Sequence, residues 1–281
     1  MAIIAFWSNE EKETGQTMSM VALSTYMSIE HNYHILNVST GFQETVLENC
    51  YWDLNKMNSL VKTLSGNNAG QLALESGIEG LAKIINSNKT SSHIVSSYTK
   101  VVFKEHLDVL CSTQVKSYDE YVRIAQLYPS ILQVANRDYD LIFVDISKSM
   151  PEEYKKQILE IADVIVVNIT QRLSTIDSLI KLKEENEFFK NNNILINIGR
   201  YDKFSKYNVK NITRYMRERK DIYAIPYSTL FFEACSEGKV AEHFLKLRRL
   251  EPDDRNAVFM EEVSRLSRDL IYKMKELQLK L

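Results

Sequence analysis

The sequence is poor in the residues that make tight turns and covalent cross-links. Eight glycines and four prolines are spread over 281 residues, and the three cysteines, Cys50, Cys111 and Cys235, form no C-x-x-C pair. Few turn residues disfavour a β-sandwich and favour long helices. The cysteine spacing argues against a zinc site or a disulfide framework, and it fits a reducing cytoplasm.

Long apolar runs and a surplus of one charge are also missing. No stretch approaches the roughly 18 apolar residues of a membrane span. The N-terminus runs into a strand without the basic leader of a signal peptide, so we expect a cytoplasmic protein. The net charge of -2 gives no reason to expect nucleic acid or an anionic membrane as a partner. The five histidines show no metal-ligand spacing, so we expect no histidine metal site.

What the chain does have is a regular alternation of short apolar runs and amphipathic stretches. The apolar runs predict strands at residues 3–7, 33–38, 107–111, 139–145, 164–168, 194–198 and 222–226. Helical spacing predicts helices at residues 16–27, 77–86, 118–136 (with a kink or break at Pro129), 152–161, 174–191, 209–219, 231–238 and 256–281. We also expect an exposed hairpin arm at 93–103 and weak helices at 45–49 and 53–64. This alternation predicts one α/β domain over residues 1–281, a doubly wound and mostly parallel sheet flanked by helices in three layers.

Residues 2–27 form the stretch around which the chain is organised. An apolar strand is followed by a polar loop, residues 8–15, and then by a Thr-led helix. This is the layout of a phosphate-binding loop, in which the loop amides and the helix N-terminus create an anion site. The layout therefore predicts a phosphate site, although the loop has little of the expected glycine and lysine.

Short motifs follow one another in a fixed order along nearly the whole chain. They are Gly15-x-Thr17 after the first strand, a strand ending on a carboxylate at 139–145, an Ala-Asp-led strand at 162–167, the helix start Ser174-Thr175-Ile176, the turn Gly199-Arg200-Tyr201-Asp202, and Ile225-Pro226-Tyr227 followed by residues 234–239. Together they resemble the ParA/MinD-like deviant Walker ATPase family, in the dimerising (SIMIBI) class of P-loop NTPases. The strand at 139–145 resembles the Walker B-type strand of that family.

Within this family the turn at 199–203 and the tyrosine-rich, Lys/Asn-rich texture look like the TadZ/CpaE type. Those proteins are bacterial partners of secretion ATPases in pilus assembly. The resemblance implies a homodimer formed through the phosphate-loop face. It also implies a protein partner from a pilus or secretion machine, and a cytoplasmic protein that such partners recruit to the membrane or the cell pole.

The same resemblance implies ATP or ADP with Mg²⁺ as the cofactor. It places the cofactor-binding residues at Lys12, Gly15, Gln16, Thr17, Arg200 and Pro226. Magnesium, if nucleotide binds, would be held by Thr17 and Asp145. Thr17 and Asp145 each also have a purely structural interpretation. Thr17 would be a hydroxyl at a helix N-terminus, and Asp145 a carboxylate that ends a strand. No catalytic residue is assigned.

The loop departs from the family pattern at most of its positions. The pattern K-G-G-x-x-G-K-[ST] falls on residues 10–17, so that Glu10 and Gln16 stand in place of the two lysines and Glu11 and Lys12 in place of the two glycines. Like charges a few ångströms apart repel by about 1 kcal/mol in water and about four times that near a protein surface. Side chains at the two glycine positions also obstruct close backbone approach to a phosphate. A carboxylate of Glu10, Glu11 or Glu13 could itself satisfy the helix N-terminal amides.

Two other functional positions of the family also lack the expected residue in this chain. The family's water-activating aspartate is matched by Ser39 or Gly41, and Gly199 stands where an adenine-contacting Asn is expected. Asn197 lies two residues too early. These losses predict weak or absent nucleotide hydrolysis.

The sequence leaves three functions open. The first is a degenerate ParA/MinD-like protein that acts as a localisation or assembly scaffold, a pseudo-ATPase. The second is an active ATPase with an atypical phosphate loop, in which Lys12 and Asp145 carry the chemistry. The third, a DNA-associated partitioning protein, is disfavoured by the net charge. The amphipathic helix at 256–281 has mixed charges on its polar face, which favours packing on the domain or on a partner over lipid.

Overall fold

The computed structural model describes residues 1–10, 14–53, 77–87, 93–191, 193–217, 222–249, 251 and 253–279. Lys12, Glu11 and Glu13 lie outside the described residues, as does nearly all of the weak helix expected at 53–64.

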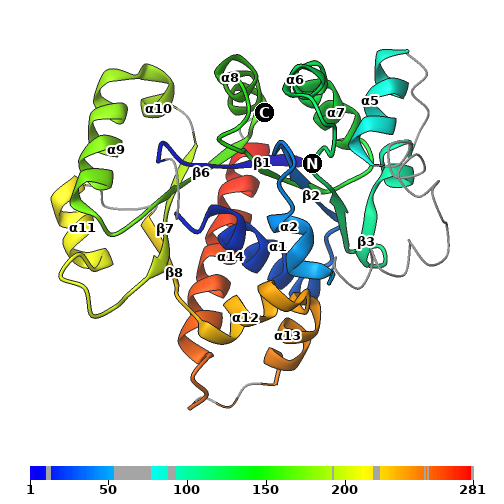
Figure 1. The fold of residues 1–281 in the computed structure, drawn as a ribbon. Helices are drawn as coiled ribbons and strands as arrows, with labels where there is room; N and C mark the ends of the chain where they lie inside the picture. The colour runs from blue at the N-terminus through cyan, green and yellow to red at the C-terminus, as the bar shows by residue number, and fades with distance from the viewer. Residues whose placement is uncertain are drawn as a thin grey trace.

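An eight-stranded sheet in the order β3-β4-β2-β5-β1-β6-β7-β8 crosses the molecule (Figure 1). Its strands are β1 (Ala2–Trp7), β2 (Ile35–Ser39), β3 (Lys100–Phe103), β4 (Leu107–Leu110), β5 (Leu141–Asp145), β6 (Val164–Ile169), β7 (Ile194–Tyr201) and β8 (Ile222–Pro226). All pairs are parallel except β3 with β4. The predicted doubly wound α/β class is confirmed. The inner strands β2, β5 and β6 are buried along their whole length, which is why they read as continuous apolar runs rather than alternating ones.

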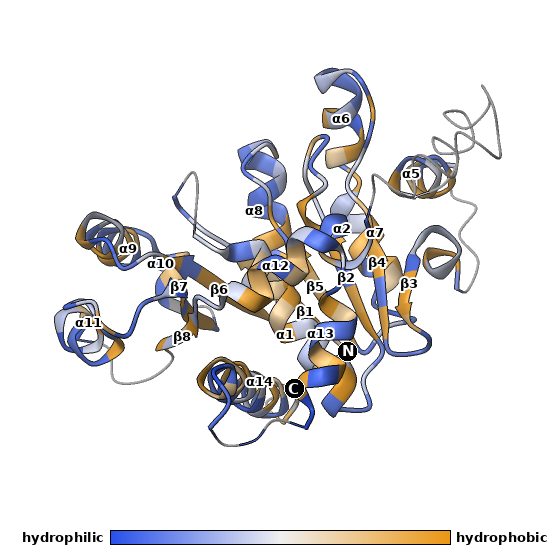
Figure 2. Ribbon diagram, turned by 60° about the horizontal axis from the view of Figure 1, so that its bottom comes forward, coloured by the Kyte–Doolittle hydropathy of each residue, from blue (hydrophilic) through white to orange (hydrophobic). Residues whose placement is uncertain are grey.

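Helices cover both faces of the sheet and create two separate cores. One face carries α5 (Ile78–Asn86), α6 (Tyr118–Ala125), α7 (Tyr128–Ala135), α8 (Glu152–Ile161), α9 (Leu173–Glu185), α10 (Glu187–Asn191) and α11 (Val209–Met216). The other carries α1 (Gln16–Glu30), α2 (Val46–Tyr51), α12 (Thr229–Glu237), α13 (Val240–Leu247) and α14 (Ala257–Gln278). Figure 2 shows the apolar colour concentrated in the strands and on the helix sides that face them. The molecule is therefore the three-layer sandwich that alternating strands and helices predict.

Several boundaries differ from those expected, each for a local reason. Pro129 lies in the first turn of α7, so the stretch 118–136 forms two helices with a break between them. The long helix expected at 174–191 is wrong, because Asn186 adopts an extended conformation and separates α9 from α10. In the expected hairpin arm, Val95–Tyr98 is a 3₁₀ helix and only β3 is a strand.

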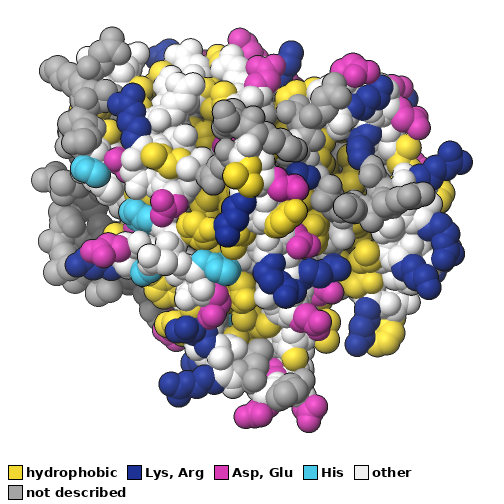
Figure 3. Space-filling model, turned by 180° about the vertical axis from the view of Figure 1, so that it is seen from behind, with side chains coloured by type: hydrophobic (Ala, Val, Ile, Leu, Met, Phe, Trp, Pro, Cys, Tyr) yellow, Lys and Arg dark blue, Asp and Glu magenta, His cyan; other side chains and the backbone are white. Residues whose placement is uncertain are grey.

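Helix α13 was not expected from the sequence. Its apolar residues Val240, Phe244 and Leu247 are buried, and they follow the helical period. The terminal helix α14 packs on the same face through a stripe of buried side chains, Phe259, Val263, Leu266, Leu270 and Met274. Both helices use their apolar sides against the sheet layer. Acidic and basic side chains are interspersed over the face in Figure 3.

Candidate functional site

The candidate site lies where the carboxyl ends of β1 and β5 meet the N-terminus of α1. In parallel α/β sheets, ligand sites form at this edge. A cavity of about 450 Å³ opens here, lined from the first loop, α1, the start of α2, the segment after β5, and Arg200. The predicted residues Gly15, Gln16, Thr17, Asp145 and Arg200 all line it.

Gly15 gives the loop its entry into α1. Its backbone is left-handed, with φ of 69°, a conformation that glycine adopts without the cost of a Cβ. The carbonyl of Gly15 accepts the first helical hydrogen bond from Ser19 N at 2.8 Å. The strand-loop-helix geometry of a phosphate loop is thus retained at its helical end.

Asp145 is bound by the two residues that follow Gly15. Gln16 Nε2 donates to Asp145 Oδ1 at 2.7 Å and to the carbonyl of Ile146 at 2.9 Å. Thr17 Oγ1 donates to Asp145 Oδ2 at 2.6 Å. Burial raises the pKa of Asp145 to about 6, against the opposing effect of these two hydrogen bonds. Both carboxylate oxygens therefore have partners from within the chain.

A second carboxylate, which sequence reasoning missed, projects into the cavity. Glu44 Oε1 accepts hydrogen bonds from Ser147 Oγ at 2.6 Å and from Ser149 Oγ at 3.2 Å. Its charge adds to the rise in the pKa of Asp145. Position alone could have indicated it, since Glu44 follows β2 just as Ser147 follows β5, and these strands are neighbours in the sheet.

The segments after β2 and β5 are joined by further hydrogen bonds. Thr40 Oγ1 donates to the carbonyl of Asp145 at 3.0 Å and accepts from Ser147 N at 2.8 Å. Phe42 N donates to Ser149 Oγ at 3.0 Å. Ser39, one of two positions matched to an activating aspartate, is buried and does not line the cavity.

Two cationic side chains also line the cavity. Lys148 Nζ donates to the carbonyl of Ser8, and it lies 5.6 Å from the centroid of the Trp7 ring. Arg200 has a positive φ of 52° and its guanidinium lies 5.9 Å from the Tyr227 ring centroid. Facing them are the carboxyl groups of Glu10, Glu44 and Asp145.

The loop backbone presses directly on the end of β7. A Cβ built on Gly199 would lie 2.0 Å from the carbonyl oxygen of Thr14, so no side chain fits at this position without a shift of the backbone. Asn197 does not substitute for the missing Asn, because it is fully buried and donates to Asn168 Oδ1 at 2.9 Å.

Pro226 lies beside the main cavity rather than in it. It lines a narrow slot with Gly15, Met18 and Tyr227 that has a volume of about 20 Å³, about the space of one water molecule. The structure therefore brings together four of the predicted cofactor residues, Gly15, Gln16, Thr17 and Arg200, in the main cavity, and Pro226 shares the adjacent slot with Gly15 and Arg200. For the glutamate hypothesis, Glu10 lines the cavity, and its backbone N–H donates to Ser8 Oγ at 3.0 Å.

No protein-family model and no curated protein matches the sequence. Solved structures do match. A ParA family ATPase from Chlorobium tepidum has a TM-score of 0.64 at 18% identity, covering 95% of this chain and 97% of that one. MinD from Pyrococcus horikoshii, complexed with Mg-ADP, has a TM-score of 0.63 at 15% identity, covering 97% and 98%. MinD in the Aquifex aeolicus MinC:MinD complex has a TM-score of 0.60 at 14% identity, covering 96% of each chain. The chain has the fold of ParA and MinD ATPases.

Proposed function

We propose that this chain, built on the ParA/MinD fold, is a degenerate member of that family that acts as a localisation or assembly scaffold. The observation that carries the proposal is the hydrogen-bonded group of Gln16, Thr17 and Asp145. At the position where the family's lysine neutralises phosphate, an amide instead binds the carboxylate that would hold magnesium. The site keeps the strand-loop-helix architecture, but its polar side chains form hydrogen bonds with one another.

The residues present do not fit a magnesium nucleotide. The described carboxyl groups in the cavity, Glu10, Glu44 and Asp145, would stand against an anionic phosphate chain. The close contact of Gly199 with Thr14 leaves no space for a base-contacting side chain at position 199. We therefore derive no hydrolytic step from this site.

As a scaffold, the protein needs partners. We propose a homodimer formed through the phosphate-loop face and a component of a pilus or secretion machine as the protein partner, located in the cytoplasm and recruited to the membrane or pole. Among the structural neighbours, MinD forms a complex with MinC. Within the described residues, no helix is both long and apolar enough to cross a bilayer.

One observation favours a second function, an active ATPase with an atypical loop. Thr17 Oγ1 and Asp145 Oδ2 lie 2.6 Å apart, and a hydroxyl beside a carboxylate is the type of oxygen pair that Mg²⁺ prefers. In this reading Lys12 would supply the missing positive charge.

Titration calorimetry with ATP and Mg²⁺ separates the two functions. We expect no measurable heat of binding to the unaltered chain, and no change in melting temperature. A working site at about 100 times its Kd would stabilise the protein by about 2.7 kcal/mol. The matched variant is Glu10→Lys with Glu11→Gly and Gln16→Lys, which restores the charges and one glycine of the family pattern and should create measurable affinity. Tight binding by the unaltered chain would reject the pseudo-ATPase proposal in favour of the second function.

A further inference from the structure

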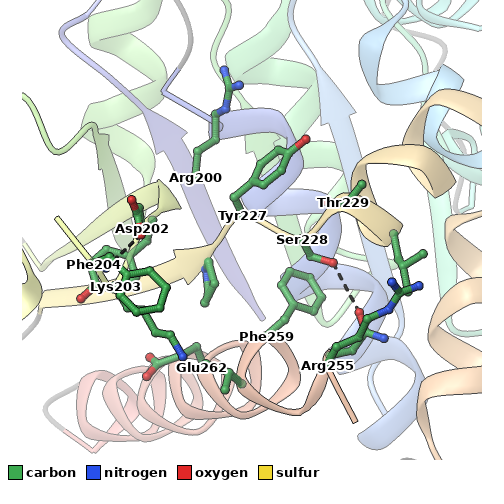
Figure 4. Close-up of a pocket in the computed structure, with 15 residues that line it drawn as sticks. Arg200, Asp202, Lys203, Phe204, Tyr227, Ser228, Thr229, Arg255, Phe259 and Glu262 are labelled. Carbon is green, nitrogen blue, oxygen red and sulfur yellow. Dashed lines mark hydrogen bonds between the residues drawn. The ribbon is translucent and has the colours of Figure 1, made fainter.

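A larger cavity lies next to the phosphate-loop site. It is a groove of about 830 Å³ between the segment that ends β7, the segment between β8 and α12, and the first turns of α14 (Figure 4). We call it the α14 groove. Arg200 lines both the groove and the phosphate-loop cavity, and no other described residue does.

The α14 groove exposes large apolar side chains at its rim. Phe204 is 86% exposed, Tyr227 48% and Val258 47%, while Phe259 is buried at the floor. A phenylalanine this exposed costs free energy that burial against a partner would recover, and contiguous apolar patches of this kind mark interaction sites.

Cationic side chains surround this apolar rim. Arg200, Lys203 and Arg255 line the groove, and among the described residues none of them forms an ion pair. Lys203 extends across the groove toward Glu262 (Figure 4), and its Nζ lies 5.2 Å from the Phe204 ring centroid. The cations are therefore available to a ligand.

The acidic side chains of the groove already have partners. Asp202 Oδ1 accepts from the backbone N–H of Phe204 at 2.9 Å, which holds the turn after β7. Glu262 Oε2 lies 2.6 Å from Arg265 Nη2 on the same helix. Three cations of the described lining thus stand against Asp202 and Glu262, and Glu262 is paired with Arg265, so the net charge of the groove is positive.

We propose that the α14 groove binds an acidic segment of a partner protein that carries an aromatic or aliphatic anchor. Carboxylates of the segment would pair with Arg200, Lys203 and Arg255, and the anchor would cover Phe204 and Tyr227. Arginine and aromatic residues are the types that dominate protein interfaces. This inference names the chemistry of a partner for the proposed scaffold. It rests on the proposed function, because Arg200 and Pro226, which the family resemblance assigns to the nucleotide, both line the groove.

An acidic peptide fits better than a nucleic acid strand. The groove has aromatic side chains on which bases could stack, but its lining has three cations, Arg200, Lys203 and Arg255, and a bound strand needs a positive track that follows successive phosphates. A peptide carries fewer charges and can place them opposite the three cations.

The test is fluorescence anisotropy with a fluorescein-labelled peptide in which Phe is flanked by Glu on both sides, measured on the full chain without nucleotide. We expect saturable binding that weakens with salt. We expect no saturable binding of the same peptide with Lys in place of Glu. Failure of the acidic peptide to bind, or equal binding of the lysine peptide or of a single-stranded oligonucleotide, would overturn the proposal.

Variants locate the binding on the molecule. Arg255→Glu and Phe204→Ala each change an exposed side chain. Each should lower the affinity of the protein for the acidic peptide by about tenfold. Lys246→Glu, on an exposed position of α13 outside the groove, is the matched charge control and should leave affinity within about twofold. If Lys246→Glu weakens binding as much as Arg255→Glu, the peptide is held by general charge and not by the groove. The ATP-binding variant of the phosphate loop should bind the peptide as the unaltered chain does, which keeps this outcome separate from that of the proposed function.

Discussion

The phosphate-loop cavity and the α14 groove share Arg200 and differ in almost everything else. In the cavity the polar atoms of Gln16, Thr17 and Asp145 bind one another, and the described carboxyl groups outnumber the cations. In the groove the three cations form no ion pair with any described residue, Glu262 is paired with Arg265, and apolar rings face solvent. A ligand gains little binding free energy at groups that are already hydrogen-bonded to one another. It gains more where it can pair with a charged group or cover an exposed ring.

A strand-loop-helix architecture that matches the family and the ability of that site to bind a ligand are therefore separate properties of a chain. The geometry of strand, loop and helix comes from backbone packing, and Gly15 with its left-handed φ is enough to preserve it. Binding depends on which polar atoms have no internal partner. By that criterion recognition in this molecule lies beside the phosphate loop, on the other side of Arg200.

The largest effect is expected from Gly199→Ala, which tests the contact between the phosphate loop and the end of β7. The new Cβ would meet the Thr14 carbonyl at 2.0 Å, so the loop or the end of β7 must move. Overpacking against backbone typically costs about 2–3 kcal/mol, a fall of roughly 5–10 °C in melting temperature for a chain of this size.

Gly41→Ala is the comparison variant for this measurement. Its Cβ would meet the side chain of Glu44, which can change rotamer, so the fall should be smaller. An unchanged melting temperature for Gly199→Ala would mean that the loop leaves β7 at little cost. The cavity would then not be held by this contact, and its contrast with the groove would be lost.

The next effect concerns the buried carboxyl group of Asp145. Its pKa is raised from 3.8 to about 6 in the folded protein, so the folded state holds a proton that the unfolded state releases first. The stability from this proton is full below about pH 4 and is lost as pH rises through about 6. At about pH 7.5 the buried charge costs roughly 2–3 kcal/mol, a net figure that already includes the hydrogen bonds from Thr17 and Gln16.

Asp145→Asn should therefore raise the melting temperature by a few degrees at about pH 7.5 and flatten its dependence on pH between about 4 and 6. Thermal melts over this pH range provide the measurement. Asp253→Asn, at an exposed turn, is the matched control and should change neither quantity. A lower melting temperature for Asp145→Asn at neutral pH would show that the charged form is favoured there. That is the state a magnesium site requires.

Sequence reasoning reached the fold because it follows from periodic patterns. The buried strands are continuous apolar runs, and helix α8 has the bounds that its spacing predicted. Gln16 and Asp145 were assigned by the resemblance to the family, after β1 and at the end of β5. Their side chains meet across 129 positions of sequence, although their role at a nucleotide stays a prediction.

What sequence reasoning missed depends on contacts that no local pattern records. Helix α13 was not predicted, because it is short and its three buried residues, Val240, Phe244 and Leu247, are interspersed with charged ones. Glu44 became a site residue only when β2 and β5 proved to be neighbours. The α14 groove joins residues 200–204 to residues 255–262, and these come together only through the packing of α14 on β8.

The smallest effect, and the sharpest test of the comparison, is Arg200→Gln. This side chain borders both sites, and glutamine keeps the start of the side chain and a hydrogen-bonding group while removing the charge and the contact with Tyr227. At an exposed position one charge contributes about 0.2–1 kcal/mol, so affinity for the acidic peptide should fall about two- to fivefold, with no change in melting temperature. Anisotropy titrations and thermal melts measure the two quantities, and Arg214→Gln on α11 is the control. If Arg200→Gln also shifts the melting temperature, Arg200 supports the closed phosphate loop as well as the groove, and the two regions are coupled through it rather than independent.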